Sequence, residues 1–99
     1  MPQVEITPNS VRLLVSAAET SAWAANWPLS RIRGHRLRAD FDVSGSLVDY
    51  ALDGRHPATS IPSDEFNALT SDMLRTRLPA THPAYFGCVG QFDAARRSR

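Results

Sequence analysis

The stretch from residue 36 to residue 43 constrains the fold of this chain most, because its apolar and charged residues alternate strictly. The apolar residues are Leu37, Ala39, Phe41 and Val43, and the charged residues between them are Arg36, Arg38, Asp40 and Asp42. A period of two places these sets on opposite faces of a half-buried strand. The pattern therefore predicts a strand with one apolar face and one charged face.

A second strand is predicted directly after the first. Ser44-Gly45 suits a two-residue turn, because Gly45 can adopt a positive φ without a Cβ clash. The chain then folds back as a hairpin over residues 36–53. The predicted pairs are Phe41 with Val48, Ala39 with Tyr50, Leu37 with Leu52 and, on the charged face, Asp40 with Asp49. The last pair brings two like charges together and is mildly destabilising.

The N-terminal quarter of the chain fits two arrangements. In the first, the turn signal at residues 7–10 joins a hairpin of residues 4–6 and 11–15. In the second, a helix begins near Ser10, because apolar residues recur after it at intervals of three and four. The β-branched ends of segment 11–15 favour the hairpin. Both arrangements include an alanine-rich helix from about residue 17 to residue 27.

A second helix is predicted after residue 62, with Ser63 as its N-cap and acidic residues facing the positive end of the helix dipole. Its apolar stripe consists of Phe66, Leu69, Met73, Leu74 and Leu78. The aromatic and glycine-rich segment 85–92 is predicted to add an edge strand, and residues 94–99 to fray. We therefore predict a single α+β domain over residues 1–93, a small antiparallel sheet built on the 36–53 hairpin with two helices on one face.

Composition excludes several classes of protein. One cysteine cannot form an internal disulfide, and no apolar run approaches the ~18 residues of a membrane helix. The N-terminus lacks the basic and apolar pattern of a secretory signal, so we expect a cytoplasmic protein without a membrane partner. All eleven basic residues are arginine, which excludes chemistry that requires a lysine.

The strongest functional signal is a segregation of charge. Four arginines occur within residues 31–38 beside Trp27, and an acidic stretch follows immediately. Arginines beside a tryptophan suit phosphates and bases, or an acidic protein surface. A net charge of +1 and the acidic stretch argue against nucleic acid. The predicted partner-binding residues are Trp27, Arg31, Arg33, Arg36, Arg38, Asp40, Asp42 and Asp49.

Catalytic and metal sites are weaker interpretations of the same sequence. Cys88 with His82 or His56 resembles a nucleophile and base, but an apolar neighbourhood suits a buried, unreactive thiol. The aspartates of the hairpin could hold a cation, although any solvated sheet face has this appearance. The spacing of the three histidines fits no zinc pattern. We therefore predict no catalytic residue, no metal and no cofactor.

Two segments carry a resemblance. The first, residues 22–30, ends a helix in Trp-Pro, and the second, residues 41–49, has the form Phe-x-x-x-Gly-x-Leu-Val-Asp. Together they resemble small uncharacterised proteins of high-GC bacteria, their phages and plasmids, in which cysteine is common where Leu29 stands here. The resemblance implies a mobile-element accessory protein that binds a host protein or nucleoprotein, for example an anti-CRISPR-like inhibitor. The alternative is a nucleic-acid-binding accessory protein that uses the arginines of residues 31–38.

Overall fold

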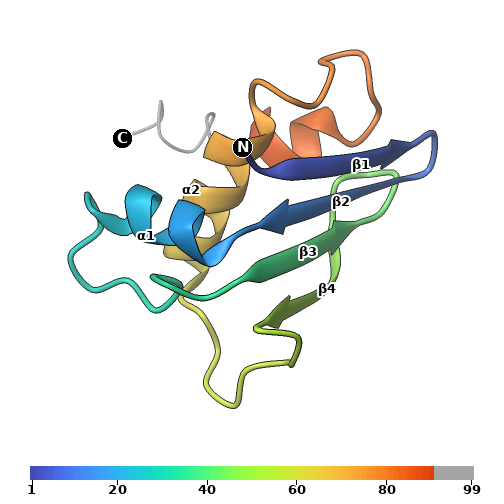
Figure 1. Ribbon diagram of the computed structural model, residues 1–99. Helices are drawn as coiled ribbons and strands as arrows, with labels where there is room; N and C mark the ends of the chain where they lie inside the picture. The colour runs from blue at the N-terminus through green and yellow to red at the C-terminus, as the bar shows by residue number, and fades with distance from the viewer. Residues whose placement is uncertain (91–99) are drawn as a thin grey trace.

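A four-stranded antiparallel sheet forms the centre of the computed structural model, which describes residues 1–90 (Figure 1). The strands follow the order of the chain: β1 (Gln3–Thr7), β2 (Ser10–Val15), β3 (Leu37–Phe41) and β4 (Leu47–Leu52). The helices are α1 (Ala17–Ala24), α2 (Ser63–Leu74) and a single π-helical turn, Phe86–Gly90. The predicted α+β class is confirmed. None of the helices within residues 1–90 is long and apolar enough to span a membrane.

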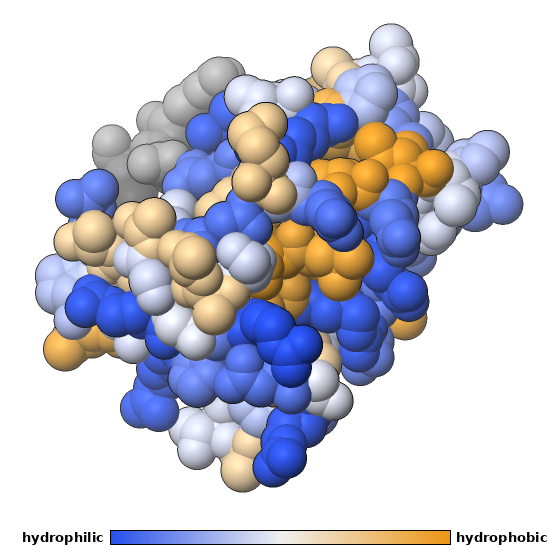
Figure 2. Space-filling view, in the orientation of Figure 1, coloured by the Kyte–Doolittle hydropathy of each residue, from blue (hydrophilic) through white to orange (hydrophobic). Residues whose placement is uncertain are grey.

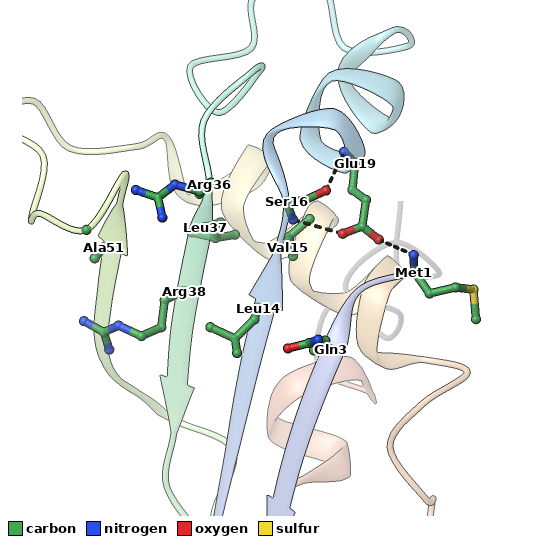
Figure 3. A pocket seen from close by; sticks show the side chains of 11 residues that line it. Met1, Gln3, Leu14, Val15, Ser16, Glu19, Arg36, Leu37, Arg38 and Ala51 are labelled. Atoms are coloured by element: carbon green, nitrogen blue, oxygen red, sulfur yellow. Dashed lines mark hydrogen bonds and ion pairs between the residues drawn. The ribbon is translucent and has the colours of Figure 1, made fainter.

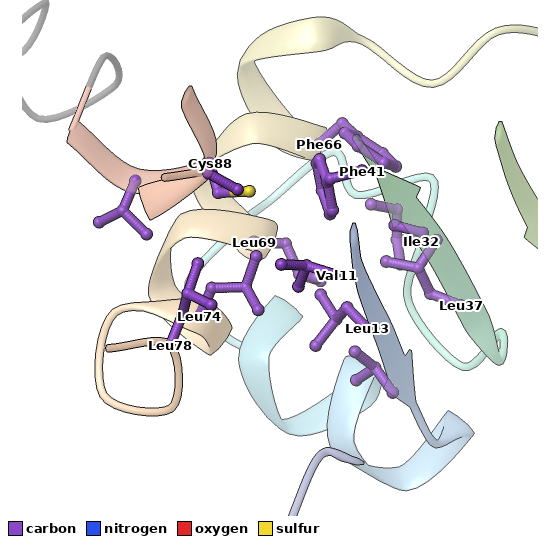
Figure 4. Close-up of a cluster of buried hydrophobic side chains, with 14 of the residues drawn as sticks. Val11, Leu13, Ile32, Leu37, Phe41, Phe66, Leu69, Leu74, Leu78 and Cys88 are labelled. Carbon is purple, nitrogen blue, oxygen red and sulfur yellow. The ribbon is translucent and has the colours of Figure 1, made fainter. Parts of the chain in front are cut away.

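The hydrophobic core lies between the inner face of the sheet and α2 (Figure 4). Alternate residues of β2 and β3 are buried there, as the period of two predicts. The predicted stripe of α2 packs against them, with Met73 only partly buried. The main core side chains are Val11, Leu13, Leu37, Phe41, Phe66, Leu69, Leu74 and Leu78. No helix among residues 1–90 packs on the outer face of the sheet, so the side chains of this face form a surface of the described part of the molecule.

The register of the central hairpin is only partly as predicted. Leu37 pairs with Leu52, Ala39 with Tyr50 and Asp40 with Asp49, but Phe41 pairs with Leu47 because of a bulge. The hairpin loop, closed by Asp42 and Ser46, has three residues instead of the predicted two, because the Asp42 N–H donates to the Ser46 carbonyl at 2.9 Å. By itself, a loop one residue longer would turn the charged side chains of β4 toward the core. The bulge leaves Val48 unpaired and so returns Asp49 to the outer face, opposite Asp40. Val48 is therefore 67% exposed, and its predicted core position is wrong.

The hairpin loop docks on the C-terminal part of the described chain through two glycines. Gly45 has φ +83°, as the turn prediction required, and a Cβ added there would lie 2.4 Å from the Ala84 carbonyl oxygen. A Cβ added at Gly87 would lie 2.1 Å from the Ser44 carbonyl oxygen. This close approach is formed by the turn at residues 86–90, so the predicted edge strand over 85–92 is wrong for its described part. Residues 91–92 and the predicted frayed tail, 94–99, lie outside the described residues.

The N-terminal segment forms the predicted hairpin, with Thr7 pairing with Ser10, and not the alternative long helix. Helix α1 then begins with a capping box between Ser16 and Glu19. It ends at Ala24, three residues before the predicted end. At this helix end the Ala24 carbonyl accepts the Trp27 N–H at 2.9 Å and the Arg33 guanidinium at 2.8 Å.

Helix α2 begins differently from the prediction. Its N-cap is Pro62, without a side-chain cap hydrogen bond, and Ser63 is the first helical residue. Glu65, one of the acidic residues predicted to face the positive end of the helix dipole, lies in the first turn as predicted and is completely buried. It lies four residues before Leu69, on the apolar side of the helix, where its carboxylate binds the loop that precedes β3.

Candidate partner-binding face

A row of charged side chains crosses the outer face of the sheet, and its members form ion pairs with one another. The ladders align Glu5, Arg12, Asp40 and Asp49 across the four strands. Arg12 Nε lies 2.6 Å from Asp40 Oδ1. Arg38 bridges the two aspartates, contacting Asp40 Oδ2 through Nη1 and Asp49 Oδ2 through Nη2 at 3.0 Å. Arg38, from the adjacent cross-strand row, thus reduces the repulsion between Asp40 and Asp49 that the sequence predicted.

The electrostatics of this charge row support its structural role. The hydrogen bond from Arg38 lowers the pKa of Asp49, and the contact with Asp40 raises the pKa of Arg12. Both shifts favour the charged forms that pair with each other. Arg38, Asp40 and Asp49 were predicted to bind a partner, but their charged groups already bind one another.

Asp42 organises the hairpin loop. Its Oδ1 accepts hydrogen bonds from the Ser44 N–H at 2.9 Å, the Ser44 hydroxyl at 2.7 Å and the Ser46 N–H at 3.1 Å. The hydroxyl of Ser44 and the N–H of Ser46 lower the pKa of Asp42. This Asx-type turn accounts for the residue type, so Asp42 acts within the loop and apart from the charge row.

Beside the charge row, the outer face is hollowed over an apolar floor (Figure 3). The hollow has a volume of about 440 Å³, and we call it the sheet hollow. Leu14 provides apolar surface at its floor, Ala51 lines it but is only 4% exposed, and Arg36 and Arg38 extend toward β4 along one side. Glu19 lies on the other side, bound to the Ser16 N–H and the Met1 amino group. Figure 2 shows an apolar patch in the middle of this face and a second one toward the upper right, with hydrophilic surface around the central patch.

Arg36 differs from Arg38, the other arginine that lines this hollow, because the Arg36 guanidinium makes no ion pair within residues 1–90. Asp53 lies opposite Arg36 on the hairpin, where its N–H donates to the Arg36 carbonyl at 2.9 Å, but its carboxylate forms no ion pair with the guanidinium. Instead, Asp53 Oδ1 accepts the Arg36 backbone N–H at 2.9 Å, and Asp53 Oδ2 lies 2.6 Å from His35 Nδ1. The hydrogen bond with His35 is the main cause of a lowered pKa at Asp53, and the hydrogen bond from the Arg36 N–H lowers this pKa further. The carboxylate fixes the backbone of Arg36 and leaves its charge available at the surface.

The loop before β3 is held by a buried carboxylate. Glu65 Oε2 lies 2.5 Å from the Ser30 hydroxyl, and its oxygens accept the N–H groups of Arg31 at 3.0 and 3.1 Å and of Ile32 at 3.2 Å. Ile32 is fully buried in the core. The guanidinium of Arg31 stays exposed and makes no hydrogen bond or ion pair among the described residues. Glu65 therefore presents Arg31 on a fixed backbone.

Trp27 is half-buried and stacks on Trp23, with ring centroids 5.2 Å apart. Trp23 Nε1 donates to Asp72 Oδ2 at 3.0 Å, which ties the pair to α2. One face of Trp27 is thus occupied within the molecule. Arg33 reaches back from the loop to the end of α1, so both residues stabilise the α1 region and neither lines the sheet hollow.

The side chains considered above for catalysis or metal binding do not lie together as a catalytic or metal site among residues 1–90. Cys88 is buried, and burial raises the pKa of its thiol to about 12. His82 Nε2 lies 2.7 Å from the Thr7 carbonyl oxygen, and His56 contacts Tyr50. Within the described part of the chain, no three histidine, cysteine or acidic side chains gather as metal ligands do. Cys88 is therefore buried in the core, and His82 and His56 each contact a neighbouring residue of the fold.

Sequence reasoning missed three residues of this region: Leu14, Arg55 and Glu65. Leu14 follows another leucine, and only its place in the alternation of β2 marks it as outward-facing. Glu65 shares a helix face with Leu69, a spacing that signals burial. Arg55 gave no local signal, and a tight turn carries it to the loop that bears Arg31.

Comparison with family models, with curated proteins and with solved structures finds no match for this chain.

Proposed function

We propose that this protein is a small non-catalytic binding protein that contacts a protein or nucleoprotein through the outer face of its sheet. One observation carries the proposal: an apolar hollow lies on this face beside Arg36, whose guanidinium has no ion pair within residues 1–90. An apolar floor with a cation at its rim suits a partner that presents an apolar side chain next to a carboxylate. Arg38 at the same rim is held by aspartates and shapes the site.

The sheet supports this role because it is rigid where the contact is made. The charge row joins all four strands, and Asp53 fixes the backbone of Arg36. A preformed surface loses little conformational freedom on binding. The resemblance to phage and plasmid proteins supports a setting for the proposal, in which the protein acts in the cytoplasm as a mobile-element accessory protein, such as an anti-CRISPR-like inhibitor of host defence.

Affinity capture with matched variants tests the proposal. The wild-type protein and the variants Leu14→Asn, Arg36→Gln and Arg12→Gln are each used as bait in lysate of a high-GC bacterium. Arg12→Gln removes the same charge as Arg36→Gln, but from a guanidinium that Asp40 already binds. We expect a partner that is retained by the wild type and Arg12→Gln and lost by the other two.

The size of the expected loss follows from the lost contact. A charge-assisted hydrogen bond contributes about 1.5–3 kcal/mol, so Arg36→Gln weakens binding roughly tenfold or more. Nuclease treatment and salt titration distinguish the nucleic-acid alternative, because phosphate contacts give a steep dependence on salt. Equal capture by all four baits would contradict the proposed face.

A further inference from the structure

A second hollow lies at the end of the sheet, between the loop before β3 and the loop after β4. Its volume is about 540 Å³, and we call it the end hollow. Arg31, His35 and Arg55 line it together with apolar side chains that include Leu52 and Ile61. It shares no lining residue with the sheet hollow, so it is a separate site.

Contacts within the fold hold Arg31, Arg55 and His35 at the end hollow. The Glu65 carboxylate binds the Arg31 N–H, as described above. The backbone of Arg55 exchanges two hydrogen bonds with Leu52, at 2.9 and 3.1 Å. His35 is held by Asp53 through Nδ1. The backbones that carry the two arginines are therefore fixed before any ligand arrives, so binding has to order only their side chains.

The charges around the end hollow do not balance. Asp53 is its one acidic lining residue, and both of its carboxylate oxygens already bind His35 and the Arg36 N–H. The guanidiniums of Arg31 and Arg55 make no ion pair within residues 1–90. The two arginines that line this hollow therefore have no counter-charge among residues 1–90, and an anion with several acceptor oxygens would supply one.

We propose that the end hollow binds a phosphate monoester, with its phosphate between Arg31 and Arg55 and its organic part against Leu52 and Ile61. A phosphate offers enough oxygens for two guanidinium forks, whereas one carboxylate matches a single fork. The volume is that of a small-molecule site and exceeds what a bare anion fills. This site goes beyond the proposed partner-binding face and does not depend on it.

NMR titration of the ¹⁵N-labelled full chain tests the site with three probes: phenyl phosphate, inorganic phosphate and benzoate. We expect phenyl phosphate to shift the amide signals of residues 31, 35 and 55. It should bind about threefold or more tightly than inorganic phosphate, because its ring covers apolar surface. Arg31→Gln and Arg55→Gln should each weaken binding about tenfold, and Arg12→Gln should leave it within about twofold. Spectra without probe verify that each variant is folded.

Several results would overturn the site. Absence of shifts at these residues, or benzoate binding as tightly as phenyl phosphate, would exclude phosphate recognition. Equal affinity for both phosphates would exclude the organic part of the ligand. A loss on Arg12→Gln as large as that on Arg31→Gln would indicate diffuse attraction of anions. Tighter binding of a 5′-phosphorylated oligonucleotide, with shifts that extend to Trp27, would assign the arginines to nucleic acid.

Discussion

Replacing Glu65 by glutamine tests how the loop before β3 is held. Three donors, the Ser30 hydroxyl and the N–H groups of Arg31 and Ile32, face the two oxygens of this buried carboxylate. Glutamine keeps one oxygen and turns an N–H₂ group toward a donor. Hydrogen bonds to a charged group contribute about 1.5–3 kcal/mol each, and removal of the desolvated charge offsets part of their loss. We expect Glu65→Gln to lower the free energy of unfolding by about 2–4 kcal/mol.

Urea denaturation measures this loss, because the total stability of a domain of this size is about 5–15 kcal/mol. The slope of the unfolding free energy against urea concentration should stay unchanged, while the urea concentration at the midpoint falls. Glu5→Gln is the matched control, since Glu5 is exposed and its one ion pair within residues 1–90 is the 4.0 Å contact with Arg12. Its effect should stay within about 0.5 kcal/mol.

A double-mutant cycle with Ser30→Ala identifies the contact itself. Ser30 donates to Glu65 at 2.5 Å and also accepts the N–H groups of Ile32 and Arg33. The two substitutions should therefore be clearly non-additive. A cost of Glu65→Gln equal to that of Glu5→Gln, or full additivity with Ser30→Ala, would refute the claim that this carboxylate holds the loop.

Three other predictions concern the hairpin, the turn after β4 and the thiol. Gly45→Ala should cost at least about 2 kcal/mol more than Gly54→Ala in thermal or urea unfolding, because both glycines have a positive φ but only Gly45 meets backbone atoms. The lowered pKa of Asp53 adds stability above its unfolded value, near 3.9, and this stability is lost as the pH falls through the folded value. Asp53→Asn should therefore flatten the acid side of the stability–pH curve, and an unchanged curve would contradict the contact with His35. Cys88 should react with a thiol reagent at pH 8 only as fast as the protein opens, and rapid reaction of the native protein would disprove its burial.

The sequence predicted the fold from local patterns that the structure confirms. Strict alternation in residues 36–43 gave the strand, and the pairs of Ala39 with Tyr50 and Leu37 with Leu52 followed from it. The position of Val48 could not be predicted, because the loop length depends on the Asp42 hydrogen bonds and on the contact between Gly45 and Gly87. That contact joins segments more than forty residues apart in the printed sequence.

The candidate site was harder to predict than the fold. Four neighbouring arginines looked equivalent in sequence, but their partners lie on different elements: Arg33 binds the end of α1 and Arg38 binds two strands. Within residues 1–90 the guanidiniums of Arg31 and Arg36 make no ion pair, and Glu65 and Asp53 bind the backbone N–H groups of these residues instead. Such differences arise from tertiary contacts, which charge patterns do not encode.

Hydrogen exchange of the complex with a captured partner tests the central claim most directly. The proposed face predicts protection on binding in residues 14, 36 and 51, around the sheet hollow. The hairpin tip serves as the internal control, because it also exposes apolar side chains, Val43, Leu47 and Val48. Protection around the sheet hollow with an unchanged tip is the expected result, and protection confined to residues 43–48 would contradict the account.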